Sequence, residues 1–280
     1  MKVLLAKSAG FCFGVKRATK MAFESAGEHD RICSLGPIIH SPQLVKKLEE
    51  LGVEVVREVE GVPENAAVIV RSHGITYEEL TQLTDAGFEV VDATCPFVKN
   101  AQNYAAQLSE EGYTVLIVGE EEHPEVQGIL SFAQDGEVMV VADLAQAEAL
   151  PRRRRIGIVA QTTQSLSNLQ KIVEICLEKS YELRVFNTIC DATKVRQDEA
   201  RDLARQGDVM LVLGGYNSAN TRRLATICEE IQPRTYHIET ADEIRDEWFE
   251  SAATVAITAG ASTPQWIIDE AVKRVEGISP

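Results

Sequence analysis

Residues 89–99 read EVVDATCPFVK and combine a short apolar run, a polar turn that contains a cysteine, and further apolar residues after a proline. Val90 and Val91 favour a β-strand. Pro96 marks the turn, and the spacing of the apolar residues from Val98 onward is that of a helix. The stretch therefore predicts a strand that leads through a turn at Cys95 into a helix, which is the basic connection of an α/β protein.

The same alternation of short β-rich runs and longer amphipathic segments continues along the whole chain, as parallel-sheet α/β units require. We expect strands at Lys2–Ala6, Arg31–Leu35, Ala67–Arg71, Glu89–Asp92, Thr114–Val118, Val138–Ala142, Ile156–Ala160, Leu183–Asn187, Val209–Leu213 and Val255–Thr258. We expect helices at Val15–Ala26, Pro42–Leu51, Tyr77–Ala86, Val98–Glu111, Leu166–Glu178, Val195–Gln206, Thr221–Glu230 and Pro264–Val275.

The turn at Cys95 has two counterparts, at Cys12 and Cys190. Each of the three cysteines follows a predicted strand, precedes a predicted helix and has a lysine four residues further on. Twenty-eight residues after each cysteine comes a polar residue just beyond the next strand: His40, His123 and Ser218. Polar residues also follow a third strand, at Ser72–Gly74, Thr162–Thr163 and Ala261–Thr263. The repeat predicts three similar α/β units, residues 13–94, residues 95–188, and residues 189–280 together with 1–12.

Composition limits the partners that this chain can have. The formal net charge of −15 repels nucleic acid and anionic lipid, so we expect neither as a partner. No apolar run approaches the roughly 18 residues of a spanning helix, and Met1–Ala6 is predicted to be a strand, not a signal segment. We therefore expect a cytoplasmic protein. The basic run Arg152–Arg155 is predicted to be a solvated turn.

The six cysteines are expected to be reduced thiols or metal ligands, because no signal segment and no C-x-x-C pair is present. Cys33, Cys176 and Cys228 lie among apolar residues of predicted strands or helices and are expected to be buried. Three units around a pseudo-threefold axis would bring the other three thiolates to one point. Such a set suits an iron–sulfur cluster with one iron that lacks a protein ligand, or a catalytic zinc with one open position.

Polar residues at the same strand ends predict an anion pocket beside the cysteines. His40, His73 and His123 can donate to an anion or ligate a metal. Pro42, Pro124 and Pro264 are expected in first helical turns, where free backbone N–H groups add to Ser218, Asn220 and Ser262. Glu125 follows His123 by two residues and is interpreted either as an acid that stabilises the helix dipole or as a proton donor.

Nine motifs, in this order along the chain, resemble the family of hydroxymethylbutenyl diphosphate reductases, the last enzymes of the methylerythritol phosphate route of isoprene biosynthesis. They are Gly10–Val15, Gly36–His40, Arg71–Gly74, Asp92–Pro96, His123–Val126, Gln161–Thr163, Asn187–Thr193, Asn217–Asn220 and Thr258–Ser262. The resemblance covers essentially the whole chain.

The resemblance implies an oxidoreductase with a trefoil-like arrangement of the three units around one four-iron, four-sulfide (4Fe–4S) cluster held by Cys12, Cys95 and Cys190. The substrate hydroxyl would face the iron without a cysteine, and ferredoxin or flavodoxin would supply two electrons. Glu125 would relay protons, and isopentenyl and dimethylallyl diphosphates would be the products. The resemblance places the diphosphate at His40, His73, Ser218, Asn220 and Ser262, and the reacting hydroxyl near His123 and Thr163.

Two points of this assignment stay open. Ala219 stands where many members of the family have a second serine, so this substrate-binding position offers a backbone N–H and no hydroxyl. Either Thr162 or Thr163 could face the substrate. The alternatives to a reductase are a zinc hydrolase with three cysteine ligands and Glu125 as base, and a non-catalytic iron–sulfur sensor or scaffold.

Overall fold

The computed structural model describes residues 1–278 and is an α/β structure with three four-stranded sheets in that range, all of them parallel. The strands are β1 (Lys2–Leu5), β2 (Ile32–Leu35), β3 (Val53–Val56), β4 (Ala67–Val70), β5 (Glu89–Asp92), β6 (Thr114–Val118), β7 (Val138–Val141), β8 (Arg153–Ala160), β9 (Ser180–Val185), β10 (Val209–Leu213), β11 (Thr235–Ile238) and β12 (Thr254–Ala259). The α-helices are α1 (Phe13–Glu28), α2 (Pro42–Glu49), α3 (Tyr77–Asp85), α4 (Pro96–Glu110), α5 (Pro124–Phe132), α6 (Leu144–Ala149), α7 (Leu166–Lys179), α8 (Asp191–Gln206), α9 (Ala219–Glu229) and α10 (Gln265–Glu276).

The three sheets share one strand order. They run β3-β2-β4-β5, β7-β6-β8-β9 and β11-β10-β12-β1. In each sheet the second strand in this order comes first along the chain, apart from β1, which comes from the N-terminal segment and takes the edge place that β5 and β9 take in the other sheets. The repeat expected from the cysteine spacing is therefore confirmed as three sheets of one topology. The exact boundaries of the three units stay a prediction.

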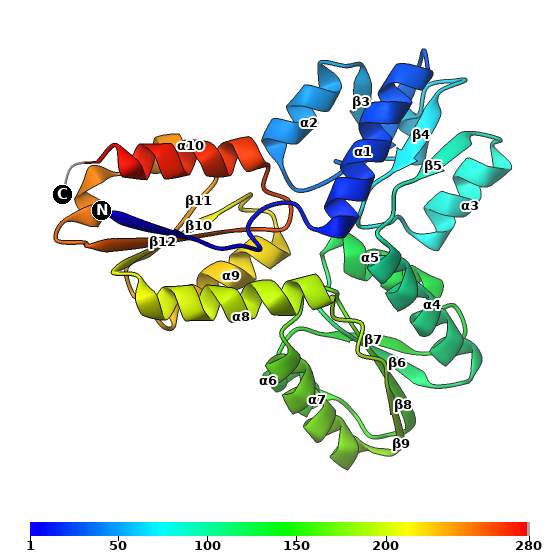
Figure 1. The fold of residues 1–280 in the computed structure, drawn as a ribbon. Coiled ribbons are helices and arrows are strands. Elements are labelled where there is room, and N and C mark those ends of the chain that lie inside the picture. The colour runs from blue at the N-terminus through cyan, green and yellow to red at the C-terminus, as the bar shows by residue number, and fades with distance from the viewer. Residues whose placement is uncertain (279–280) are drawn as a thin grey trace. The chain divides into compact units, whose positions relative to one another are not determined.

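The chain folds as two compact bodies. The terminal body contains residues 1–16, residues 40–45 and the described residues from 191 onward. Its sheet has α10 on one face and α8 and α9 on the other (Figure 1). Leu211 packs in the cluster that contains Ile268 of α10, whereas its neighbours Met210 and Val212 pack in the cluster that contains Leu224 of α9. Strands buried on both faces explain why β10 is apolar at every position.

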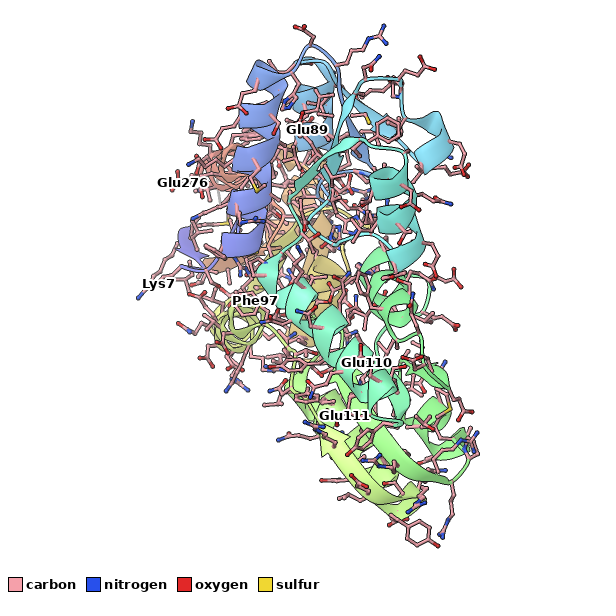
Figure 2. All side chains as sticks on the ribbon, turned by 90° about the vertical axis from the view of Figure 1, so that its right-hand side faces the viewer. Lys7, Glu89, Phe97, Glu110, Glu111 and Glu276 are labelled. Atoms are coloured by element: carbon pink, nitrogen blue, oxygen red, sulfur yellow. The ribbon has the colours of Figure 1, made fainter. Side chains whose placement is uncertain are left out.

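The central body contains residues 17–39 and 46–190 and holds the other two sheets. In the sheet β7-β6-β8-β9, Ile117 packs on the side of α4 and α5, and Leu116 packs on the side of α6 and α7. Figure 2 shows α4 from Phe97 in its first turn to Glu110 and Glu111 at its C-terminal end. The long α4 thus begins directly after Cys95 and covers one face of this sheet.

All ten expected strands and all eight expected helices are present, with ends shifted by up to four residues. Two edge strands, β3 and β11, were not expected, and neither was helix α6. Helix α5 was anticipated only through its first turn at Pro124 and Glu125. Pro264 is the N-cap of α10 and does not lie in its first turn, so that expectation was wrong.

The prediction of a turn at Arg152–Arg155 was wrong, because β8 begins at Arg153. These first residues of β8 pair only with β9, since pairing with β6 begins at Ile156. Their charges are met by neighbouring carboxylates: Arg153 Nε lies 2.5 Å from Glu137, and Arg155 Nε lies 2.9 Å from Glu182. Among the described residues no helix has the length and apolar character needed to cross a membrane.

A close contact between β8 and α4 leads to a test of this packing. A Cβ atom added at Gly157 would lie 2.6 Å from Cδ2 of Leu108, which is fully buried. We expect Gly157→Ala to lower the free energy of unfolding by about 1–3 kcal/mol, because overpacking a dense core costs that much. Urea unfolding would measure the change.

Gly27 supplies the matched control, because it lies in α1 and no atom is within 4 Å of the position of its added Cβ. Gly27→Ala should raise stability by about 0.5–1 kcal/mol through the better helix propensity of alanine. Equal stability of the Gly157→Ala variant and the parent would contradict the packing of β8 against α4.

Candidate functional site

The three cysteines of the repeat lie in equivalent loops. Each follows the fourth strand of its sheet order and precedes a helix, and its backbone N–H donates to the carbonyl oxygen two residues beyond the end of the neighbouring third strand. These hydrogen bonds are Cys12 to Ala261 at 3.1 Å, Cys95 to Ser72 at 2.9 Å, and Cys190 to Thr162 at 3.0 Å. The same type of backbone hydrogen bond therefore fixes the position of all three cysteines.

Exposure separates the six cysteines into two classes. Cys12, Cys95 and Cys190 are partly exposed, whereas the other three are buried, as expected for core residues. Burial raises the pKa of Cys33 and of Cys176 to about 11, and that of Cys228 to about 12, so these three stay protonated thiols at neutral pH.

The side chains of Cys12, Cys95 and Cys190 are suited to hold a metal–sulfur group. The three residues are partly open to a ligand and held by the same backbone contact, and thiolates are the ligands that iron–sulfur clusters use. Within residues 1–278 no three histidine, cysteine, aspartate or glutamate side chains are grouped as a metal site. Cys12 belongs to the terminal body and Cys95 and Cys190 to the central body, so their joint role as ligands stays a prediction.

The residues expected 28 positions after the cysteines are equivalent in the structure. His40, His123 and Ser218 each lie five residues beyond the second strand in the order of their sheet, which is β2, β6 or β10. Each of the three lies at or close to the start of a helix. Ser218 caps α9 through its Oγ, which accepts from the N–H of Thr221 at 3.3 Å. Nδ1 of His123 accepts from the N–H of Glu125 at 3.1 Å. The neutral imidazole of His123 therefore carries its hydrogen on Nε2 and can donate from that atom.

The loops after the third strands place His73, Thr163 and Ser262 at one equivalent position, three residues beyond β4, β8 and β12. In the central body, the rings of His73 and His123 meet edge to face, with 5.6 Å between their centroids. In the terminal body, Oγ of Ser262 donates to the carbonyl oxygen of His40 at 3.2 Å. The structure thus brings together His73 with His123, and His40 with Ser262.

Glu125 is the buried acid of the central body, with 2% of its surface exposed. Its Oε1 accepts from the N–H of Thr162 at 2.6 Å, and its Oε2 accepts from Oγ1 of Thr162 at 3.0 Å. Burial raises the pKa of Glu125 to about 7, although both hydrogen bonds from Thr162 act to lower it. A large fraction of Glu125 is therefore protonated near neutral pH, as a general acid requires.

These contacts distinguish the two threonines that the sequence left open. Thr162 is buried and joins Glu125 to Cys190, because its N–H and hydroxyl donate to the carboxylate while its carbonyl accepts from the cysteine N–H. Thr163 is only partly buried. Thr162 is therefore the partner of the acid.

The polar residues of the terminal body gather near the start of α9. Ser218, Asn220 and Ser262 are each less than 8% exposed, and the buried Nδ2 of Asn220 has no hydrogen-bond partner within the described residues. Ala219, the first residue of α9, is also buried. Backbone N–H groups of a first helical turn have no partner inside the helix, so Ala219 and Asn220 add two donors to this group. Such a set suits an anion.

Arg71 is a positioning residue that the sequence did not assign, although it begins one of the quoted motifs. Its Nε donates to the carbonyl oxygen of Gly74 at 3.1 Å, so it braces the loop that carries His73. Its side chain also fills the space beside Gly36, where an added Cβ would lie 2.6 Å from Nη1. The available signal was a basic residue directly after the apolar strand β4, within a motif that the sequence had already singled out.

Known proteins of one kind match the chain over its full length. A 4-hydroxy-3-methylbut-2-enyl diphosphate reductase of Syntrophotalea carbinolica is 63% identical over 279 residues, which are 100% of both chains. The reductase of Trichlorobacter lovleyi is 60% identical, with 100% of this chain and 99% of that one covered.

Two solved structures agree with this match. One is (E)-4-hydroxy-3-methyl-but-2-enyl diphosphate reductase, described as the terminal enzyme of the non-mevalonate pathway, with 46% identity, a TM-score of 0.72, and 99% of this chain and 100% of that chain covered. The other is the Plasmodium falciparum reductase, with 25% identity, a TM-score of 0.90, and coverage of 98% and 87%. The family model described as LytB protein matches residues 3–276, and the chain therefore belongs to the LytB family.

Proposed function

We propose that the protein is the reductase that converts (E)-4-hydroxy-3-methylbut-2-enyl diphosphate to isopentenyl and dimethylallyl diphosphates, the last step of the methylerythritol phosphate pathway. Two electrons and two protons enter, the allylic C–O bond breaks, and water leaves. Full-length membership of the LytB family supports the reaction. The structural observation that carries it is Glu125, a buried acid with a pKa of about 7 whose partner Thr162 contacts the loop of Cys190.

Cys12, Cys95 and Cys190 are proposed to hold one 4Fe–4S cluster. Equivalent loops and partial exposure support this choice over the three buried cysteines. When bound, the cluster supplies electrons and an iron that lacks a protein ligand. A ferredoxin or flavodoxin is the proposed electron donor.

The residues of the central body are proposed to handle protons. Glu125 delivers a proton toward the reacting end of the substrate, and Thr162 fixes the orientation of both carboxylate oxygens. His123 presents Nε2–H, since its Nδ1 is engaged by the N–H of Glu125. His73 packs against His123 and fixes the plane of its ring.

The residues of the terminal body are proposed to hold the diphosphate. Ser218, Asn220 and His40 supply side-chain donors, and Ser262 adds a fourth when its hydroxyl turns from the carbonyl oxygen of His40 to the anion. The backbone N–H of Ala219 replaces the hydroxyl that many relatives offer there. The start of α9 favours negative charge through its aligned N–H groups. The net charge of −15 makes such local donors necessary for an anionic substrate.

Glu125→Gln tests the assignment of the acid. The amide keeps the shape but cannot release a proton, so we expect anaerobic turnover to fall by about 100-fold or more while the cluster absorbance persists. Glu122→Gln is the matched control, because Glu122 is exposed in the preceding turn. Undiminished turnover of the Glu125→Gln variant would remove Glu125 from the mechanism.

The pH dependence gives a second test. Because the acid form is the active one, kcat should fall as the pH rises through about 7, the pKa of Glu125. The folded pKa lies above the ordinary value of 4.5, so the folded chain retains a proton that the unfolded chain has lost. Stability of the parent relative to Glu125→Gln should therefore decrease as the pH rises from about 4.5 to 7. A flat difference in urea midpoint over this range would contradict the raised pKa.

Cys190→Ser should reduce bound iron and sulfide sharply after anaerobic purification, because one of three proposed ligands is lost. Cys228→Ala should retain both, since Cys228 lies in the core between α8 and α9. A colourless parent that contains zinc and no iron would instead support a hydrolase and overturn the cluster. Iron without turnover of the substrate by a reduced donor would support a sensor.

A further inference from the structure

Helix α8 holds the loop that leads to Cys12. Arg196 is buried, and its Nη2 donates to the carbonyl oxygen of Gly10 at 2.6 Å. One turn further along α8, Glu199 accepts from the backbone N–H groups of Lys7 at 2.7 Å and Ser8 at 2.9 Å, and from the hydroxyl of Ser8. The side chain of Lys7 points outward to solvent, and its backbone N–H is the group that donates to Glu199 (Figure 2). Two side chains of one helix thus fix residues 7–10.

The loops of the other two cysteines contain a brace of their own. Oδ1 of Asp92 accepts from the N–H of Thr94 at 2.9 Å, and Oδ1 of Asn187 accepts from the N–H of Ile189 at 3.3 Å. Both are Asx-turns, and both join the position three residues before the cysteine to the position one residue before it. The two cysteines are therefore preceded by a locally stabilised turn.

The loop of Cys12 cannot form this turn. The position three residues before Cys12 is Ala9, whose methyl group accepts no hydrogen bond. The next residue, Gly10, has a φ of +92° and is the residue type with the greatest backbone freedom. A loop with a glycine and without an Asx-turn needs restraint from outside, and α8 provides it.

The helix that follows each of the three cysteines contacts the loop of another one. Arg17 of α1 donates to the carbonyl oxygens of Thr94 at 3.1 Å and Asp92 at 3.3 Å, directly before Cys95. Tyr104 of α4 stacks on Phe186, four residues before Cys190, with 4.1 Å between the ring centroids. Arg196 of α8 completes this order, because α8 follows Cys190 and holds the loop of Cys12.

We propose that Arg196 and Glu199 are positioning residues for Cys12, which replace from α8 the Asx-turn that the loop of Cys12 lacks. The proposal concerns the thiol of Cys12 and rests on the proposed function only where it makes this thiol a cluster ligand. Removing Arg196 should loosen Cys12 and leave Cys95 and Cys190 in place, because their turns are internal.

Alkylation of the cluster-free, reduced chain by iodoacetamide tests the proposal, with the rate at each cysteine followed by peptide mass spectrometry. In Arg196→Gln we expect Cys12 to react roughly tenfold faster, because the variant loses one charge-assisted hydrogen bond to the loop of Cys12. The rates at Cys95 and Cys190 should stay unchanged. Arg196→Lys should restore part of the protection, because lysine can still donate to the carbonyl of Gly10. Glu199→Gln provides a second, milder variant if Arg196→Gln does not fold.

Two controls make the result specific. Arg205→Gln changes an exposed arginine of the same helix that pairs with Asp202, and all three rates should stay as in the parent. Arg17→Gln removes a brace from the loop of Cys95 only, so Cys12 should stay unchanged, and Cys95 should be accelerated less than Cys12 is in Arg196→Gln because the Asx-turn of Asp92 remains. Equal acceleration of all three cysteines in Arg196→Gln, or of none, would overturn the proposal.

The loaded protein separates this proposal from the proposed function. If Cys12 is a ligand, Arg196→Gln should also lose iron to a chelator roughly tenfold faster than the parent. Faster alkylation of Cys12 with unchanged iron retention would support the role of α8 and contradict Cys12 as a ligand. Faster iron loss with unchanged alkylation of Cys12 would overturn the role of α8.

Discussion

The hydrogen bond from each cysteine N–H to the loop of the neighbouring strand is the contact on which the site depends. It forms because the third and fourth strands of every sheet are adjacent and parallel, so their carboxyl ends lie at the same edge. One such bond is worth only about 1 kcal/mol in net stability, but its direction fixes where the next side chains can lie. In the central body, the carbonyl oxygen of Thr162 accepts from the N–H of Cys190, and the N–H of the same threonine donates to Glu125. A single residue therefore links the cysteine to the buried acid.

Two opposed effects act on the pKa of Glu125. Removal from water disfavours the carboxylate, whereas two hydrogen bonds from Thr162 favour it, and desolvation prevails. A stronger set of donors would leave a permanent anion, and a drier pocket without Thr162 would leave an acid too weak to give up its proton. Burial together with the pairing to one threonine leaves the pKa of Glu125 at about 7, in the range that a general acid needs near neutral pH.

The sequence alone was sufficient for the three equivalent cysteine loops and for the sheet cores. Strands buried on both faces are easily recognised: β10 is apolar throughout, and β6 is apolar after Thr114. The edge strands β3 and β11 were missed because they are four residues long and polar residues interrupt them, Glu54 in β3 and Thr235 and His237 in β11. The arginines at the start of β8 misled for a related reason, since they lie where β8 has a neighbour on one side only. The pairing of Glu125 with Thr162 joins residues 37 positions apart, and spacing carries no information about which of two adjacent threonines turns inward.

The placement of β1 has a consequence for synthesis on the ribosome. This strand is made first, yet among the described residues it pairs only with β12, more than 250 residues later, and the carbonyl that accepts from the N–H of Cys12 belongs to Ala261. In the other two cysteine loops, the N–H of Cys95 and of Cys190 donates to a carbonyl oxygen earlier in the chain, and so do the Asx-turns that precede them. A chain whose translation stops before β12 therefore lacks the acceptor for Cys12 alone, and the proposed set of three ligands is incomplete until β12 has been made.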